Sequence, residues 1–513
     1  NRVAGIDLAD GEELSQVQVS VKLTAFYSQF DPLDPEGSKA KVCDRIRVLL
    51  RKAKELGAAI HFDMEQYRYK DLTLSILKEL LTEEEFRDRT DLGITLQAYL
   101  RDSYQDLQDV ITWAKQRGNP VTVRLVKGAY WDPETIKAEQ NHWQQPVYND
   151  KAATDVNYER MTRLLLENHE YHYAAIGSHN VRSQALACAI AETLKIPSRR
   201  FEMQVLYGMG DKLAKALVKR GHRVRVYSPY GKLLPGMAYL IRRLLENTAN
   251  SSFLRQNQEE KPIEELIAPP IPQPRTPSPA PQTLFNAAPD TDYADVETRI
   301  KAEEALDKVR NFLGKTYLPF IDGEYVETAD IIESVNPSRA SEIVGRVGQI
   351  SVEQAEQAMK AAKAAFTSWK NTTATERANI LRKAADIMEA RRHELNAWIC
   401  LEVGKVISQA DPEVSEAIDF CRYYAAEMER LDSGYNYDVA GENNHYFYQP
   451  KGIAIVISPW NFPFAIATGM TVAALVAGNC TLLKPAATSS IIAAKITEIL
   501  IEAGIPKGVL QYV

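Results

Sequence analysis

The eight residues from Arg124 to Trp131, RLVKGAYW, carry the densest group of chemically useful side chains in this chain. Apolar and polar residues alternate up to Leu125, as in a strand, and the run ends at Gly128 before two aromatic residues. A glycine there lets the backbone approach a ligand closely, and the cations flanking the apolar residues suit an electron-rich, anionic partner. The alternative is an edge strand with a solvated arginine and lysine, and this stretch alone favours neither reading.

The elements around this stretch predict a barrel. Short β-rich runs alternate with longer helical patterns, which indicates a parallel sheet, and seven such runs approach the eight strands of a (β/α)8 barrel. Either the barrel is open or its first strand lies upstream of Asn1, and the absence of a starting methionine favours the second. The predicted strands are Gln18–Leu23, Ala59–Met64, Gly93–Tyr99, Val121–Gly128, Tyr173–His179, Phe201–Tyr207 and Arg223–Tyr227.

The chemistry of such barrels is found at the carboxyl ends of the strands. Any one polar residue there could simply satisfy a hydrogen bond at a strand end. Here almost every end supplies one, which predicts a polar site in a single mouth of the barrel. The residues at these ends are Lys22, Asp63, Glu65, Gln97, Arg124, Lys127, His179, Asn180, Leu206 and Tyr227.

A predicted last barrel helix, from about Pro235 to Asn247, carries Arg242 and Arg243 side by side, with Glu246 one turn later. Adjacent guanidinium groups repel each other unless an anion meets them, and their planar forks match a carboxylate. An anionic substrate at the mouth is one explanation. A surface ion-pair network with Glu246 is the other.

Composition restricts the class of protein. The net charge of −7 and the lack of a basic cluster argue against nucleic-acid binding. The longest run of small apolar residues, Thr468–Gly478, is too short to span a membrane, and no signal peptide is evident. Five scattered cysteines form no CxxC pair, so we expect a reducing cytoplasm and no metal site. They are Cys43, Cys188, Cys400, Cys421 and Cys480.

A proline-rich stretch separates two parts of the chain. Nine of the 25 prolines lie between Lys261 and Asp290, a composition that prefers extended polyproline II conformations. We interpret it as a spacer rather than as a ligand for a proline-binding domain. The predicted organisation is a barrel over residues 1–260, a linker over 261–300 and a second domain over 301–513.

The second domain has two predicted capping boxes, Ser351 with Gln354 and Thr373 with Glu376, which open amphipathic helices. Cys400 and Cys421 lie in apolar helical contexts and are predicted to be core residues.

A two-strand pattern is expected around Asn444–Pro450, and a βαβ pattern follows it. Ile453–Ser458 and Cys480–Lys484 are predicted as strands on either side of a helix from about Pro463 to Ala477, and a third strand begins at Val509. The pattern is compatible with a doubly wound nucleotide-binding sheet, although no GxGxxG motif follows either strand. Asn461 follows Pro459 and Trp460 in a predicted turn, a pattern that is compatible with an ordinary turn asparagine.

The motifs of the first part resemble the proline dehydrogenase domain of the bifunctional proline utilization A family. VSVKLTA, HFDMEQ, LQAY, RLVKGAYWD, SHN and YLIRRLLENTANSSF occur in the family's order from Val19 to Phe253. The resemblance implies a (β/α)8 flavoenzyme that oxidises L-proline to Δ1-pyrroline-5-carboxylate and passes electrons to a membrane quinone. The family's first strand, with an acidic residue that helps to close the substrate pocket, has no counterpart here.

The resemblance also implies roles for individual residues. Arg242 and Arg243 would clamp the proline carboxylate beside Lys22, and Asp63 would hold the arginine and lysine side chains. The pyrrolidine ring would pack against Tyr130, Leu206 and Tyr227. Arg124 would lie near the reactive flavin nitrogen. The remaining FAD contacts would come from Gln97, Val126, Lys127, Gly128, Ala129, Trp131, Lys151, His179 and Glu246.

In the second part, GIAIVISPWNFPFAI and AGNCTLLKPA resemble the aldehyde dehydrogenase superfamily. The position behind a proline dehydrogenase domain points to the glutamate semialdehyde branch. The resemblance implies an oxyanion donor at Asn461 and a contact from Lys484 to the ribose of NAD. It also implies a cofactor lining from Ile457, Ser458, Pro459, Trp460, Asn461 and Ala486. Ala487 replaces an acidic residue that often holds the ribose hydroxyls, and the nucleophilic cysteine would lie beyond Val513.

Together these patterns predict an internal portion of a bifunctional enzyme that converts proline to glutamate in two oxidations with FAD and NAD. We expect it in the cytoplasm, with a peripheral position at the inner face of the bacterial membrane and homo-oligomerisation left open. One alternative is a non-catalytic scaffold or interaction fragment of that enzyme. A DNA-binding regulator, as some relatives are, is less favoured because no basic DNA-binding segment is present.

Overall fold

A computed structural model describes residues 15, 17–248, 262–272 and 285–513 of the chain. It forms two compact units, residues 1–278 and 279–513, which are described in turn. No helix in these described ranges is both long and apolar enough to cross a membrane.

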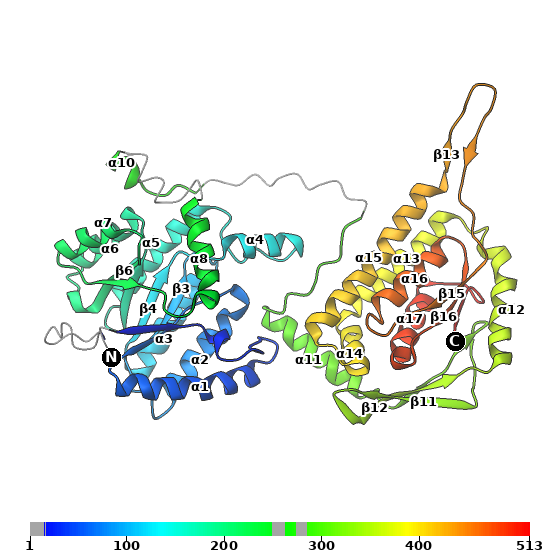
Figure 1. Ribbon diagram of the computed structural model, residues 1–513, viewed down its shortest axis with the longest axis horizontal. Helices are drawn as coiled ribbons and strands as arrows, with labels where there is room; N and C mark the ends of the chain where they lie inside the picture. Colours follow the sequence, from blue (N-terminus) through cyan, green and yellow to red (C-terminus); the bar gives the residue numbers. More distant parts are fainter. Residues whose placement is uncertain (1–14, 16, 249–261, 273–284) are drawn as a thin grey trace. The chain divides into compact units, whose positions relative to one another are not determined.

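The first unit is built on a seven-stranded parallel sheet in which every strand pairs with its neighbour in chain order (Figure 1). This arrangement confirms the predicted barrel-type sheet with seven strands. The sheet is curled: Arg124 on the central fourth strand contacts side chains of both the first and the sixth strand, which a flat sheet would hold too far apart. The strands are β1 (Gln18–Val21), β2 (Ala59–Phe62), β3 (Leu92–Gln97), β4 (Val121–Val126), β5 (His172–Gly177), β6 (Phe201–Leu206) and β7 (Val224–Tyr227).

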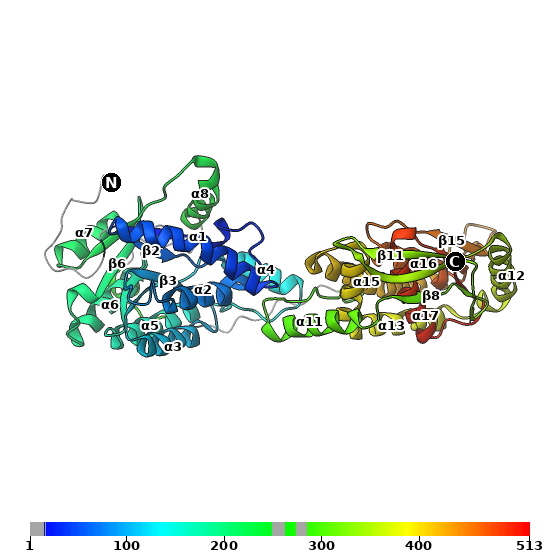
Figure 2. The same cartoon turned by 90° about the horizontal axis from the view of Figure 1, so that it is seen from below.

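Helices follow the strands and cover the outer face of this sheet (Figure 2). The first shows why: Val42, Cys43, Ile46 and Leu50 recur at helical spacing and are fully buried, and Asp34 caps the helix by accepting from the Gly37 amide. The helices are α1 (Pro35–Glu55), α2 (Lys70–Thr82), α3 (Ser103–Arg117), α4 (Trp131–Gln140), α5 (Lys151–Glu167), α6 (Val181–Thr193), α7 (Asp211–Lys219), α8 (Leu233–Thr248) and α10 (Ile263–Leu266).

The second unit contains a five-stranded sheet in the order β10-β9-β17-β16-β15. Its parallel part confirms the predicted βαβ unit and the predicted third strand, while the hairpin of β9 and β10 joins it antiparallel. The strands are β9 (Phe320–Ile321), β10 (Glu324–Tyr325), β15 (Ile453–Ile457), β16 (Cys480–Lys484) and β17 (Leu510–Tyr512). A second sheet holds β8 (Lys315–Tyr317), β11 (Asp330–Asn336) and β12 (Arg339–Gln349).

Helices pack around these sheets in the second unit (Figure 1). The capping boxes that the sequence predicts are both present, Ser351 with Gln354 and Thr373 with Glu376. Cys421 is buried in the core and Cys400 packs against it, as predicted. The helices are α11 (Val296–Arg310), α12 (Val352–Trp369), α13 (Ala374–Ala390), α14 (Arg392–Val403), α15 (Ile407–Asp432), α16 (Ala465–Val476) and α17 (Ser490–Ala503).

The two-strand pattern expected around Asn444–Pro450 is placed differently. Its strands are β13 (Tyr435–Asn436) and β14 (His445–Tyr446), which form a hairpin that projects from the second unit (Figure 1). The cross-strand pair of Tyr435 and Tyr446 sets this register, because aromatic pairs stabilise facing positions of antiparallel strands.

Candidate functional site

Arg124 occupies the centre of the site. It points from β4 into the curled sheet, where it is buried and meets acceptors from three other parts of the barrel. Its Nη1 donates to Asp63 at 2.6 Å and its Nε to Gln204 at 2.7 Å. Its Nη2 donates to Gln18 at 2.9 Å and to Ser20 at 3.0 Å. Burial lowers the pKa of Arg124 and the Asp63 carboxylate opposes that shift, so the guanidinium stays cationic at neutral pH.

Asp63 joins Arg124 to Tyr227. The second oxygen of this carboxylate accepts from the Tyr227 hydroxyl at 2.9 Å, and the Arg124 guanidinium lies 5.4 Å from the centre of the Tyr227 ring. Burial raises the pKa of Tyr227, and Asp63 raises it further, so this phenol keeps its proton. The three side chains form one fixed cluster at the mouth of the barrel. On its open side, Tyr227 stacks with Tyr239 of α8 at a centroid distance of 6.3 Å.

Lys22 belongs to a second cluster. Its ammonium donates to the Tyr130 hydroxyl at 3.0 Å and lies 3.8 Å from the Glu65 carboxylate. Glu65 is itself held by the Thr24 hydroxyl at 2.9 Å. The resemblance assigns both the arginine and the lysine to Asp63, whereas in the structure Asp63 holds Arg124 and Glu65 lies beside Lys22.

In the loop after β4, the backbone at Gly128 lies close to the Tyr99 ring, and its predicted approach to a ligand stays a prediction. Gly128 has a φ of +137°, and a Cβ at this position would lie 2.4 Å from the Tyr99 ring, so only glycine fits. The Tyr99 amide donates to the Lys127 carbonyl at 2.7 Å, and the Lys127 ammonium pairs with Asp155 at 2.5 Å. Trp131 Nε1 donates to the Tyr148 carbonyl at 2.8 Å. These contacts fix the loop, including Val126 and Ala129, as one wall of the mouth.

Gln97 and His179 face the same region. Gln97 is buried at the end of β3, and its Oε1 has no hydrogen-bond partner within the described residues. His179 follows β5 and accepts from the Leu206 amide through Nε2 at 2.9 Å. Burial lowers the pKa of His179 to about 4, with a contribution from the charge of Arg243, so this imidazole is neutral at pH 7. Lys151 is the first residue of α5, and its predicted contact with the cofactor stays a prediction.

The arginine pair lies on α8. The Arg243 guanidinium lies 5.3 Å from the centre of the Tyr239 ring, next to the Tyr227 stack. The side chains of Arg242 and Glu246 lie outside the described part of the structure, and their predicted roles stay predictions.

In the second unit, the predicted cofactor residues meet at one edge of the sheet. Ile457 pairs with Lys484 in register, and the Ser458 amide donates to the Lys484 carbonyl at 3.3 Å. The carboxyl ends of β15 and β16 therefore lie side by side, where doubly wound sheets bind nucleotides. Trp460, Asn461 and Lys484 are exposed, Pro459 and Ala486 are half-buried, and Ile457 is 67% exposed.

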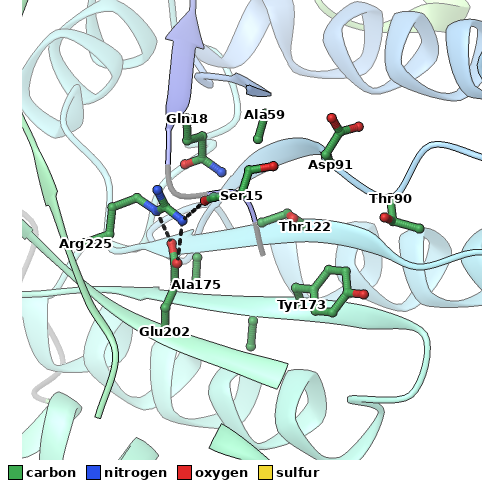
Figure 3. Close-up of a pocket in the computed structure, with 11 residues that line it drawn as sticks. Ser15, Gln18, Ala59, Thr90, Asp91, Thr122, Tyr173, Ala175, Glu202 and Arg225 are labelled. Carbon is green, nitrogen blue, oxygen red and sulfur yellow. Dashed lines mark hydrogen bonds and ion pairs between the residues drawn. The ribbon is translucent and has the colours of Figure 1, made fainter. Parts of the chain in front are cut away.

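A further small cavity lies at the opposite end of the barrel (Figure 3). It is lined where the strands begin, with Gln18, Ala59, Thr122 and Tyr173 near the starts of β1, β2, β4 and β5. Because barrel chemistry uses the carboxyl ends, this cavity is not the candidate site. Across the described ranges, no group of three or more His, Cys, Asp or Glu side chains is placed to hold a metal ion.

Comparisons with known proteins match both parts of the chain. A proline dehydrogenase family model matches residues 3–256, and an aldehyde dehydrogenase family model matches residues 325–513. The bifunctional protein PutA of Escherichia coli is 32% identical over 521 residues, covering 96% of this chain. Over nearly its whole length the chain is therefore similar to proline utilization A proteins, with a proline dehydrogenase domain followed by an aldehyde dehydrogenase domain. It spans 38% of that relative, and 40% of the Rhizobium meliloti protein PutA, which is 33% identical.

Solved structures of proline utilization A proteins share the fold. A crystal structure of the Bdellovibrio bacteriovorus protein inactivated by N-propargylglycine is 44% identical, with a TM-score of 0.89 over 97% of this chain and 53% of that one. The second part alone is also similar to 1-pyrroline-5-carboxylate dehydrogenase 2 of Halalkalibacterium halodurans. That protein is 47% identical over 232 residues, which are 45% of each chain.

Sequence reasoning missed three residues around Arg124 in this barrel, namely Gln18, Ser20 and Gln204. Their signal is the two-residue period of inward-facing positions: Gln18 and Ser20 alternate on β1, and Glu202 and Gln204 alternate on β6. Polar residues at inward positions of a buried strand need partners, and the inward Arg124 supplies them.

Proposed function

We propose that the first unit oxidises L-proline to Δ1-pyrroline-5-carboxylate with FAD as the bound cofactor. The observation that carries the proposal is the cluster of Arg124, Asp63 and Tyr227 at the mouth, beside the loop of Gly128. The residues fit a flavin: the buried Gln97 Oε1 is an acceptor without a described partner, and Arg124 is a cation at the same mouth. FAD, when bound, takes the hydride from the carbon next to the proline nitrogen.

The chain's own residues bind and orient the substrate. Arg242 and Arg243 hold its carboxylate, with Lys22 as a further cation at the same mouth. Tyr130, Leu206 and Tyr227 pack against the ring and exclude water from it. Asp63 fixes Arg124 and Tyr227, so no reorganisation is needed when charge develops.

The cofactor contacts follow the same geometry. Arg124 supplies a fixed positive charge where negative charge accumulates, and the neutral His179 adds no second charge there. Gln97, Val126, Lys127, Gly128, Ala129, Trp131, Lys151 and Glu246 complete the proposed cradle. The proposed boundaries are residues 1–260 for this domain and 261–300 for the linker.

The second unit, residues 301–513, is proposed as part of an NAD-dependent glutamate semialdehyde dehydrogenase domain. Ile457 to Asn461, Lys484 and Ala486 are its proposed nucleotide edge, with Asn461 as oxyanion donor. The five cysteines are poor nucleophiles, because burial raises their pKa values, for example to about 12 for Cys400 and Cys421. We therefore assign the second oxidation to the whole protein and not to these residues.

For the whole protein we propose glutamate as the final product and a membrane quinone as electron acceptor for the flavin. This acceptor implies a cytoplasmic enzyme that meets the inner face of the membrane. Homo-oligomerisation is compatible with the proposal and is not required by it.

The test is the visible spectrum of the flavin-loaded chain before and after anaerobic addition of L-proline. We expect flavin bands that bleach with L-proline and persist with L-alanine, which has the carboxylate but no ring. A chain that binds no FAD, or bound FAD that L-proline leaves oxidised, would contradict the proposal and favour a scaffold role.

A further inference from the structure

A second layer of polar side chains lies behind Arg124, deeper in the barrel. Gln204 on β6 accepts from Arg124 Nε at 2.7 Å, and its own Nε2 donates to Glu202 at 2.6 Å. Both residues are almost fully buried, 4% and 2% exposed. Neither reaches the mouth of the barrel directly, so their contact with the site runs through Arg124.

Glu202 is an anchored carboxylate. Arg225 on β7 donates to it through Nε at 2.7 Å and Nη2 at 2.9 Å, a two-pronged contact that fixes the carboxylate plane. Arg225 Nη2 also donates to the Ser15 carbonyl at 2.8 Å (Figure 3). Arg223 lies 3.5 Å from Glu202. The carboxylate therefore has little freedom to rotate.

This anchor decides which way the Gln204 amide points. A carboxylate only accepts hydrogen bonds, so the NH2 end of the amide must face Glu202. The carbonyl end is then left for Arg124 Nε. With Nη1 on Asp63 and Nη2 on Gln18, all three nitrogens of the planar guanidinium have fixed partners.

The neutral amide also has an electrostatic consequence. A glutamate at position 204 would place a second carboxylate beside Glu202, where like charges repel. It would also add a second anion beside Arg124, which already pairs with Asp63. Glutamine fixes the guanidinium without cancelling its charge.

We infer that Gln204 and Glu202 are positioning residues, which hold the Arg124 guanidinium in the orientation that flavin reduction requires. The inference rests on the proposed function, because it takes Arg124 to lie against the flavin. It assigns a role in the reaction to residues that touch neither substrate nor cofactor.

The test compares Gln204→Met, Glu202→Gln and the matched control Gln184→Met. Gln184 is a buried glutamine of the same unit whose amide donates to the Ile176 and Ser178 carbonyls instead of to a site residue. Each flavin-loaded variant is examined for melting temperature, flavin midpoint potential, proline affinity and the rate of flavin reduction at saturating L-proline. Crystal structures of the wild-type chain and of Gln204→Met complete the set.

For Gln204→Met we expect a reduction rate lower by about 10- to 100-fold, since a misplacement of about 1 Å can have that effect. The midpoint potential should fall, because a displaced cation stabilises reduced flavin less, while proline affinity should stay within about threefold. Glu202→Gln should shift rate and potential in the same direction by less. Gln184→Met should lower the melting temperature and leave rate and potential unchanged.

Equal losses of melting temperature in Gln204→Met and Gln184→Met, with rate and potential unchanged in both, would overturn the inference. If L-proline fails to reduce the wild-type flavin, the proposed function fails, and the crystal structures still decide this inference. An unmoved Arg124 guanidinium in Gln204→Met would then refute it, and a rotated one would support it.

Discussion

Both units hold carboxylates in their interiors, but the two units place those carboxylates differently. In the second unit, Glu402 accepts from the amides of Ile491 and Ile492 at the start of α17, both at 2.8 Å. Glu413 accepts from the amides of Phe464 and Ala465 where α16 starts. These carboxylates satisfy helix amides that lack partners within the helix, and so they attach one element to another.

In the first unit the buried carboxylates meet arginine side chains. Asp63 pairs with Arg124, and Glu202 pairs with Arg225. The pair of Arg124 and Asp63 lies at the carboxyl ends of the strands, where a ligand can enter. The positive charge that meets the Asp63 carboxylate is the guanidinium of a side chain. The comparison teaches that burial of a charge does not by itself mark a functional site. The Arg124 pair differs in lying at an open mouth, whereas the buried carboxylates of the second unit attach elements to one another, even where a side chain such as Arg392 on Asp411 or Lys405 on Glu413 also meets them.

We expect the largest effect of a single substitution at Arg124. Arg124→Met should lower the rate of flavin reduction by L-proline by about 10³-fold, the scale of losing one fixed charge partner in an active site. Rapid mixing under anaerobic conditions measures this rate. The matched control is Arg377→Met in the second unit, a buried arginine that donates to the Val476 carbonyl at 2.7 Å. It should reduce the stability of its unit only, and equal rate losses in both variants would remove the distinction.

The next effect is the pH dependence of the second unit. Burial raises the pKa of Glu402 to about 7 from an ordinary 4.5, so the folded state holds this proton more tightly than the unfolded state. The contribution of Glu402 to the free energy of unfolding is therefore fully present below about pH 4.5. It is lost as the pH rises through 7, and the loss is up to about 3 kcal/mol. Urea unfolding of this unit at pH 5 and pH 8 measures it.

Glu402→Gln supplies the control for that pH dependence, since an amide does not titrate. We expect the difference between its stabilities at pH 5 and pH 8 to shrink relative to the wild-type chain. A second unit whose stability rises over this range in the wild-type chain, or an unchanged slope in Glu402→Gln, would show that Glu402 is not the titrating group.

Tyr227→Phe tests the contribution of the Tyr227 hydroxyl to the cluster of Arg124 and Asp63 in the first unit. It removes the hydrogen bond to the charged Asp63, which is worth about 1.5–3 kcal/mol, so flavin reduction should slow by about tenfold. Tyr158→Phe is the control, because that buried hydroxyl makes only long contacts, 3.4 Å to Gly177 and 3.5 Å to Leu125. A Tyr158→Phe effect as large as that of Tyr227→Phe would contradict the account.

The smallest expected effect is local to the second unit. Thr373→Ala removes the cap of α13 and should cost about 1 kcal/mol of stability, read as a lower urea midpoint of this unit. Flavin reduction should be unaffected. The conservative variant Thr373→Ser keeps the hydroxyl and should retain most of the stability, and a loss as large as with alanine would show that the cap is not the cause.

The sequence predicts helices and strands well where the apolar residues follow a single spacing, either that of a strand or that of a helix. The seven strands of the first unit and the β15–α16–β16 unit follow from alternation and turn residues, and the capping boxes follow from their spacing. The hairpin near residue 440 is predicted too late along the chain, because strands of two residues leave almost no period to detect.

Around the site, the sequence indicates which residues gather and leaves their pairing open. The carboxyl-end rule brings Asp63, Arg124 and Tyr227 together without naming partners. The two-residue spacing of Gln18 and Gln204 on their strands indicates that they face inward and need partners, but it does not say which partners. The curl of the sheet, which brings β1 and β6 to the same guanidinium, shows that the partner is Arg124.

The most direct test of the distinction between the two units is amide hydrogen exchange of the FAD-free chain with and without added FAD. The account predicts slower exchange in the first unit, at residues 63–66, 97–99 and 124–131. It predicts no change at residues 402–413 and 490–493 of the second unit. Unchanged exchange throughout the first unit, or protection at Glu402 and Glu413 instead, would contradict the claim that the buried charges of the barrel serve a ligand.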